Sequence, residues 1–347
     1  MNRTLLMLLT ASLLLAACGA TDPQAVENDA GAAASPVATQ TTAATSDTGS
    51  TARVGLDWTP NTNHTGLYVA QNNGYYRERG LTVDIVQAQE GGTVEQLVAA
   101  GRLHFGVSYQ ESVTQARVEG LPIVSVAAII QHNTSGFASR ADSGITSPKD
   151  FEGKQYGGFG SPTEQAVLKG LMDCAGADIN KVAFVDIGST DFFVATERGD
   201  IDFAWIFEGW TGMEAEERGT PINIIMMNDL NCVPDYYTPV LITSEKLIAE
   251  EPDLVRHFMA ATSAGYQFAI NNPDQAADVL LAAAPELNEG LVKRSQQYLA
   301  RQYQADAPRW GEQKTDVWRE YADWMAERKL ITKTIEPERT FTNEFLP

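Results

Sequence analysis

The sequence predicts an α/β protein made of two lobes, and three observations lead to this prediction. From residue 53 onward, short apolar strands alternate with helical segments, which is typical of mixed, mostly parallel sheets with helices on both faces. The alternation occurs in two successive blocks, and a last strand, 238–243, follows the second block. We expect this strand to rejoin the sheet of the first block. The chain would then cross between the lobes twice, near residues 138 and 239, and the two hinge crossovers would leave a cleft that can hold a ligand.

The N-terminal residues have the pattern of an export signal followed by a tether. Residues 1–17 place Arg3 before an apolar run, 5–15, which is shorter than the roughly 20 residues that a membrane span needs. The run ends in LAAC, which resembles the bacterial lipobox, and this resemblance implies cleavage before Cys18, lipidation of its thiol and anchoring to the outer face of the cytoplasmic membrane. An ordinary signal peptide with a chance cysteine is the alternative. Residues 18–51 are nearly all Ala, Thr, Ser, Gly, Asp and Pro, so we expect a disordered tether.

Each block contains four expected strands. The strands of the first block are 53–58, 81–87, 103–108 and 121–130, with helices at 64–79 and 93–101 and a short helix after residue 108. The second block has strands 154–160, 181–187, 201–207 and 222–227 and helices 162–176 and 190–198. We therefore expect lobe 1 to contain 52–138 and 239–347, with a helical C-terminal extension, and lobe 2 to contain 139–238. In the extension, Trp310, Trp318 and Trp324 have helix-like spacing and are expected to pack in the core.

The composition excludes several classes of partner and cofactor. The chain has 25 basic and 45 acidic residues, a net charge of −20, and a strongly acidic protein repels phosphate backbones, so no nucleic-acid partner is expected. Cys174 and Cys232 could form one disulfide, but two cysteines so far apart carry no spacing signal. The four histidines are scattered, and we recognise no metal-ligand set, phosphate-cradling loop or nucleophile–base pair. We therefore expect a monomer without a metal, a cofactor or catalytic activity.

Polar side chains are concentrated where the first two strand–helix units of lobe 1 should meet the cleft. Asp57 and Trp58 end the first expected strand, and Asn61, Asn63 and His64 lie at the start of the next helix. A helix start needs one capping side chain, for which asparagine is well suited, so capping alone is the alternative explanation for either asparagine. Because amide groups both donate and accept, we expect at least one of these three side chains to contact the ligand. By the same placement at the end of a strand, Tyr109 is expected to line the cleft.

A glycine-rich turn in lobe 2 offers a second set of hydrogen-bonding groups. In GGFGSPTEQ, Gly160 precedes Ser161, and Thr163 and Glu164 lie in the first turn of a helix that has proline at its start. Free amides at a helix N-terminus bind anions or carbonyl oxygens. We expect this turn to contact the ligand, and a plain strand-to-helix turn is the alternative.

Aromatic and acidic residues are expected on the rest of the lobe 2 wall. Trp205, Glu208 and Trp210 lie near the end of strand 201–207, and a carboxylate between two tryptophans is rarely buried without a partner. Glu208 could accept hydrogen bonds from a ring N–H or an amino group. Asp191 precedes two phenylalanines, and Tyr237 lies at the second crossover. Each aromatic face stacked on a planar ligand contributes on the order of 1 kcal/mol beyond area burial.

Four motifs in this order resemble a known family. The segments DWTPNTNHTGLYVAQNNGYY, YGGFGSPTEQAVLKGLM, DFAWIFEGWTGMEAE and DYYTPVLITSE are similar to those of solute-binding proteins of bacterial ABC importers, in the branch related to thiamin-pyrimidine synthases. The resemblance extends from residue 53 to about residue 330. It implies a periplasmic-binding-protein type 2 fold, a small heteroaromatic ligand, and an ABC permease with its ATPase subunit as partners. The synthases carry a cysteine-rich motif that we do not find here, and a lipobox suits a receptor, so an enzyme is the less favoured alternative.

The identity of the ligand stays open between riboflavin and a pyrimidine that is a breakdown product of thiamin. Members of the branch carry riboflavin or N-formyl-4-amino-5-aminomethyl-2-methylpyrimidine, and more distant members carry alkanesulfonates or nitrate. The four motifs contain almost no Lys or Arg, which argues against an anionic ligand. We expect riboflavin, with the pyrimidine as the alternative, because many aromatic residues should lie near the cleft: Trp58, Tyr68, Tyr109, Phe159, Phe192, Trp205, Phe207, Trp210 and Tyr237.

Overall fold

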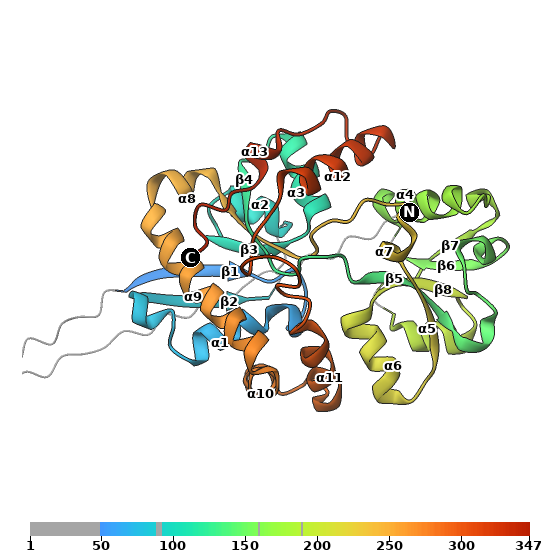
Figure 1. Ribbon diagram of the computed structural model, residues 1–347, viewed down its shortest axis with the longest axis horizontal. Helices are drawn as coiled ribbons and strands as arrows, with labels where there is room; N and C mark the ends of the chain where they lie inside the picture. The colour runs from blue at the N-terminus through green and yellow to red at the C-terminus, as the bar shows by residue number, and fades with distance from the viewer. Residues whose placement is uncertain (1–48, 88–91, 159, 189) are drawn as a thin grey trace, which may run out of the picture. The chain divides into compact units, whose positions relative to one another are not determined.

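Two five-stranded sheets organise the part of the chain that the computed structural model describes, residues 49–87, 92–158, 160–188 and 190–347 (Figure 1). The first sheet has the strand order β2-β1-β3-β10-β4, formed by β1 (Ser50–Gly55), β2 (Leu81–Val86), β3 (Phe105–Ser108), β4 (Ile123–Ala128) and β10 (Val240–Ser244). The second has the order β7-β6-β8-β5-β9, formed by β5 (Ser135–Arg140), β6 (Gln155–Gly158), β7 (Ala183–Asp186), β8 (Phe203–Phe207) and β9 (Ile222–Met226). The expected signal peptide, Cys18, the tether as far as residue 48, and Phe159 lie outside the described residues.

The two sheets share one strand arrangement. In the first sheet, β1 is parallel to β2 and β3, and β10 is antiparallel to β3 and β4. In the second, β6 is parallel to β7 and β8, and β5 is antiparallel to β8 and β9. Four strands of each described sheet therefore run one way, and the strand that arrives through a crossover runs the other way. This arrangement confirms the predicted α/β class with mixed, mostly parallel sheets, and β10 rejoins the first sheet as expected.

Helices connect the strands and surround both sheets (Figure 1). The α-helices are α1 (Thr65–Asn72), α2 (Val94–Ala99), α3 (Gln110–Glu119), α4 (Pro162–Cys174), α5 (Phe192–Arg198), α6 (Met213–Arg218), α7 (Met227–Leu230), α8 (Glu245–Glu250), α9 (Pro252–Asn271), α10 (Pro273–Ala283), α11 (Glu289–Leu299), α12 (Thr315–Glu327) and α13 (Pro337–Thr340). The short 3₁₀ helices are η1 (Thr62–His64), η2 (Arg77–Arg79), η3 (Ala141–Ser143), η4 (Pro148–Phe151) and η5 (Ile179–Lys181), and η6 (Glu208–Gly212) is a π-helical turn. Among the described residues, no helix combines the length and the apolar character that a membrane span requires.

Some predicted element boundaries were wrong. The helix expected at 64–79 ends at Asn72, because Gly74 adopts a φ of +79°, a conformation that glycine tolerates and that stops a helix. β1 begins at Ser50, inside the segment assigned to the tether, because its first residues pair with the start of β2. Strand β5 was not predicted, since SGFASR lacks a continuous apolar run. It belongs wholly to the second sheet, so the chain crosses before Ser135, and the lobe boundaries at 138 and 239 remain a proposal.

Helix α12 packs into the apolar cores of both sheets. Its Trp318 lies in the core beside β4 and β10 of the first sheet. One turn further along, Tyr321 and Trp324 lie in the core of the second sheet with residues of α4. Trp310, Trp318 and Trp324 are all buried, which confirms the prediction that they are core residues.

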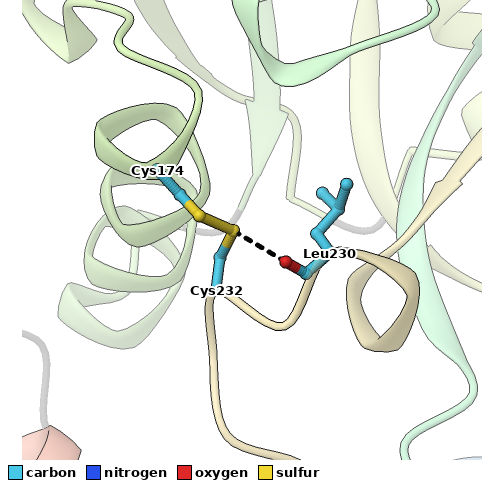
Figure 2. The surroundings of a disulfide bond; sticks show 3 residues. All are labelled: Cys174, Leu230 and Cys232. Carbon is cyan, nitrogen blue, oxygen red and sulfur yellow. Dashed lines mark hydrogen bonds between the residues drawn. A yellow bond between two sulfur atoms is a disulfide. The ribbon is translucent and has the colours of Figure 1, made fainter.

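A disulfide joins Cys174 at the end of α4 to Cys232 in the segment after α7 (Figure 2). The Cα atoms of the two residues are 5.9 Å apart, within the range that a disulfide spans. The sequence left this pairing open. The bond closes the chain around β7, β8 and β9, so it braces the second sheet rather than linking it to the first.

The two crossovers are tied together by one histidine. His132, in the first crossover, has Nδ1 2.5 Å from Asp235 Oδ2 in the second crossover and Nε2 2.9 Å from Asp306 Oδ1. The backbone N–H of Asn133 also donates to Asp235, at 2.9 Å. The hydrogen bond to Asp235, followed by that to Asp306, raises the pKa of His132 to about 9 although partial burial opposes this.

This histidine should stabilise the fold in a pH-dependent way. Because the pKa of His132 in the folded protein lies above its ordinary value of 6.5, its contribution is fully present below about pH 6.5 and is lost as the pH rises through about 9. His132→Ala should therefore lower the free energy of unfolding measured with urea near pH 6, and the difference from the unmodified protein should shrink near pH 10. Solvent exposure of the ring keeps the effect small. His257→Ala, at an exposed position on α9, is the control, and an equal loss at both pH values for His132→Ala would contradict the expectation.

Candidate ligand-binding site

A cavity of about 540 Å³ is lined by residues that follow strands of both sheets. Its volume is within the range of small-molecule sites. Asp57 follows β1, Tyr109 follows β3, and Phe207 ends β8, so carboxyl ends of strands from both sheets meet at this cavity. The crossovers contribute Thr134 and Thr238.

We call the lining residues that follow strands of the first sheet the first wall, and those that follow strands of the second sheet the second wall. In the first wall, Asp57 makes side-chain hydrogen bonds through both of its carboxylate oxygens. Its side chain is 6% exposed. Oδ1 lies 2.6 Å from His64 Nε2, and Oδ2 accepts a hydrogen bond of 2.5 Å from the Tyr109 hydroxyl. Nδ1 of the fully buried His64 accepts from the backbone N–H of Asn61 at 3.2 Å, which leaves Nε2 as the protonated nitrogen that donates to Asp57.

This hydrogen bonding keeps Asp57 ionised. Burial alone would raise the pKa of Asp57, but the neighbouring His64 and the hydrogen bonds from His64 and Tyr109 hold it below its ordinary value. Burial, and then the carboxylate of Asp57, raises the pKa of Tyr109 well above its ordinary value. Tyr109 therefore remains a hydrogen-bond donor, and the cavity wall carries a fixed negative charge.

The two asparagines of the first wall have different roles. The Asn61 side chain caps η1, since Oδ1 accepts from the backbone N–H of Asn63 at 2.8 Å and Nδ2 donates to the Thr59 carbonyl at 3.0 Å. Asn61 therefore fits the capping alternative, although it lines the cavity. The side chain of Asn63 also lines the cavity and makes no hydrogen bond to another described residue. Its amide group can therefore accept hydrogen bonds from a ligand and donate hydrogen bonds to it.

Aromatic rings form much of the cavity surface. Trp58 is 55% exposed and Phe207 39% exposed, although both are large apolar side chains. Nε1 of Trp205 is buried and finds no hydrogen-bond partner among the described residues. An unpaired buried N–H is costly, so a ligand acceptor at this place would be favourable. Among the described residues, six aromatic ones line the cavity: Trp58, Tyr109, Phe192, Trp205, Phe207 and Trp210.

The acidic residues of the second-sheet wall have structural partners. Asp191 caps α5 by accepting from the backbone N–H of Val194 at 3.1 Å. Glu214 accepts from Arg218 Nε at 2.8 Å. Glu164 accepts from the Tyr156 hydroxyl at 3.1 Å and from the backbone N–H of Ser161 at 2.9 Å. These three carboxylates line the cavity with Asp57, and no Lys or Arg is among the described residues that line it.

Six predicted site residues do not line this cavity. His64 is one of them, since its fully buried side chain lies behind Asp57. Gly160 and Ser161 form the turn before α4, where Ser161 takes part in a capping box with Glu164, and Thr163 is in the first turn behind it. Tyr237 is buried in the core of the first sheet, and its hydroxyl accepts from the backbone N–H of Lys314 at 2.9 Å. Glu208 accepts from the Tyr298 hydroxyl at 2.8 Å, outside the lining.

The site also includes residues that were not predicted. Thr134, Thr190, Thr211 and Thr238 line the cavity with small hydroxyl side chains, for which the sequence carries no signal. Thr62 lies inside the motif DWTPNTNH and could have been included on that ground. No group of three His, Cys, Asp or Glu residues suited to a metal ion comes together in the described parts of the chain.

Helix α11 links the two walls of the cavity. The hydroxyl of the buried Ser295 is 2.5 Å from Thr62 Oγ1 of the first wall, and it donates to the carbonyl of Gly209 in the second wall. On the same helix, Arg294 pairs with Glu217 of α6 at 2.7 Å. We name this set of contacts between α11 and residues 208–217 the α11 seam. Through Ser295, it also holds Thr62 and Gly209 close together.

Comparisons with known proteins support the fold and narrow the function. A family model described as NMT1/THI5 like matches residues 61–276. A formylaminopyrimidine-binding protein from Halalkalibacterium halodurans is 31% identical over 300 residues, which cover 84% of this chain and 90% of that protein. A 4-amino-5-hydroxymethyl-2-methylpyrimidine phosphate synthase from Legionella pneumophila is 25% identical, covering 84% and 91%. A riboflavin-binding protein from Chloroflexus aurantiacus is 24% identical, covering 96% and 95%.

A solved structure agrees with the architecture. The ligand-binding component of an ABC-type import system from Staphylococcus aureus superposes with a TM-score of 0.65 at 14% identity, covering 85% of this chain and 97% of that one. At this identity the likeness shows the fold alone. It confirms the predicted two-lobed, periplasmic-binding-protein fold.

Proposed function

Because the chain belongs to the NMT1/THI5-like family, we propose that it is the solute-binding component of an ABC importer and that its ligand is a formylated aminopyrimidine. The protein would bind the ligand between its two walls and deliver it to a permease driven by an ATPase subunit. Binding would favour the conformer in which both walls contact the ligand.

The composition of the cavity carries this proposal. A planar ring can stack on Trp58 or Phe207, and its amino groups can donate to Asp57 or to the Asn63 carbonyl oxygen. The unpaired Nε1–H of Trp205 suits a ring nitrogen or a formyl oxygen. The absence of Lys and Arg from the described lining disfavours sulfonates and other anions.

The sequence alone favoured riboflavin, and the comparisons now favour the pyrimidine. The relative named for formylaminopyrimidine is 31% identical to this chain, and the one named for riboflavin is 24% identical. Riboflavin remains the second candidate because six of the described lining residues are aromatic, which also suits a three-ring ligand.

Calorimetric titration with N-formyl-4-amino-5-aminomethyl-2-methylpyrimidine tests the proposal. We expect one site with a dissociation constant in the micromolar range or below. In parallel, riboflavin fluorescence should stay unchanged on addition of protein. Strong quenching of riboflavin, together with no heat from the pyrimidine, would replace the proposed ligand by riboflavin.

A binding role and an enzymatic role can be separated in the same sample. The relative from Legionella pneumophila is named as a synthase, so turnover is the rival to transport. A carrier should return the pyrimidine chemically unchanged after long incubation, as seen by mass spectrometry. A modified product would contradict the proposal.

We further propose that the protein acts outside the cytoplasm, held to the membrane by lipid on Cys18. The LAAC sequence at residues 15–18 supports this placement.

A further inference from the structure

Asp57 is a buried carboxylate, and neither Lys nor Arg is among the described residues that line its 540 Å³ cavity. Its side chain is 6% exposed, so water solvates the carboxylate much less than it would at the protein surface. The ionic neighbour that the structure offers within the described residues is His64. An ionised carboxylate in such a place costs several kcal/mol unless a positive charge or several hydrogen bonds compensate it.

In the capping contact, Nδ1 of His64 is a hydrogen-bond acceptor. Nδ1 faces the backbone N–H of Asn61 at 3.2 Å, and this contact requires a lone pair on Nδ1. A doubly protonated ring would set two N–H groups against each other. His64 therefore donates one hydrogen bond to Asp57 through Nε2, and the Tyr109 hydroxyl donates a second.

The rest of the cavity adds no compensating charge. Asp191 lies 3.9 Å from Arg218, which also pairs with Glu214, so these two carboxylates share a cation that lies outside the lining. Within the described parts of the chain, Asp57 has no Lys or Arg in such an ion pair, and its neighbour is His64. A carboxylate can accept about four hydrogen bonds, and its side-chain partners supply two, so Asp57 can still accept from a ligand.

Aromatic faces next to this carboxylate suit a cation. Trp58 follows Asp57 directly in the chain and exposes 55% of its surface, and Phe207 lies on the opposite wall. Tryptophan is the side chain that attracts cations most strongly through its ring face. A buried anion beside exposed aromatic rings is the combination that recognises a positively charged planar ring.

We propose that the protein binds its heteroaromatic ligand as a cation, with a charged ring N–H or amino group donating to Asp57 and the ring lying against Trp58. This inference rests on the proposed function and adds the charge state of the ligand to it. For an aminopyrimidine, the ring nitrogen takes up a proton from solution when the complex forms. The site would thus select heteroaromatic bases and discriminate against isosteres that cannot be protonated.

The number of protons taken up on binding tests the inference directly. Titrations of the formylated aminopyrimidine into the unmodified protein, in buffers of different ionisation enthalpy, should show uptake of about one proton above the pKa of the free pyrimidine. In that range the affinity should fall close to tenfold for each unit of pH. A pyrimidine methylated on the ring nitrogen, which is a permanent cation, should bind with little dependence on pH.

Variants identify the group that receives the proton. Asp57→Asn should bind the aminopyrimidine at least tenfold more weakly and abolish proton uptake. Asp253→Asn, which removes the same charge from an exposed site on α9, should behave as the unmodified protein. If Asp57→Asn binds as tightly as the unmodified protein, the proton goes to Asp57 and the inference is overturned.

The outcomes separate this inference from the proposed function. Tight binding with no proton uptake and no pH dependence would overturn the cationic ligand while leaving the pyrimidine-binding function in place. No binding of any pyrimidine at any pH would overturn both. The measurement on the unmodified protein decides the question even if Asp57→Asn fails to fold.

Discussion

Replacing Trp58 by alanine should weaken ligand binding about 30-fold while leaving the ligand-free protein nearly as stable as before. Trp58 lines the cavity and is 55% exposed, so its ring makes few contacts that the fold needs. Aromatic anchors of this kind contribute about 2 kcal/mol to binding, and each 1.4 kcal/mol corresponds to about tenfold in affinity. Calorimetric titration gives the affinity, and urea denaturation gives the free energy of unfolding.

Phe184→Ala is the matched control for this experiment. Phe184 is 41% exposed, on β7, and does not line the cavity. Its removal should leave the affinity for the ligand unchanged. It should change the free energy of unfolding by no more than about 1 kcal/mol. If Trp58→Ala keeps full affinity, or if the ligand-free variant unfolds far more easily, then Trp58 does not hold the ligand.

Trp318→Ala should lower the free energy of unfolding by about 3–5 kcal/mol, the usual cost of removing a fully buried large aromatic ring. Trp318 is fully buried on α12, and its Nε1–H donates to Gln313 Oε1 at 3.2 Å. Urea denaturation followed by circular dichroism measures the change. The affinity of the molecules that remain folded should be little changed, because Trp318 does not line the cavity.

Trp318→Phe separates packing from hydrogen bonding. Phenylalanine keeps most of the apolar contacts and loses the bond to Gln313, so the loss of stability should be smaller than for alanine. A cost below about 1 kcal/mol for Trp318→Ala would show that the packing of α12 against the first sheet is dispensable.

The fold was predictable because most of its strands are apolar and because proline or glycine marks the ends of several helices. β4 and β8 read clearly as buried strands. β5 did not, because small residues such as Gly136 and Ala138 let it pack between β8 and β9 without an apolar run. The strand conformation of β5 is determined by its pairing with segments that are distant in the sequence. A local sequence pattern does not show this pairing.

The candidate site was predictable in its location and less so in its members. The predicted residues after β1 and β3 line the cavity, because the carboxyl ends of parallel strands meet at one edge. Glu208 was misjudged, since its partner Tyr298 lies 90 residues away on α11. Tyr237 was expected to contact the ligand because it is an aromatic residue at the second crossover. Its hydroxyl instead accepts from the backbone N–H of Lys314, just before α12.

The double packing of α12 also bears on how the chain reaches its folded state. Residues 315–327 complete both cores, and the first sheet needs β10, which follows the whole second sheet in the sequence. While the polypeptide is being synthesised, neither half can therefore close its core. Export of the proposed receptor would require a precursor in this condition, because a secretion channel threads an unfolded chain. Its disulfide can then form after translocation, in an oxidising compartment.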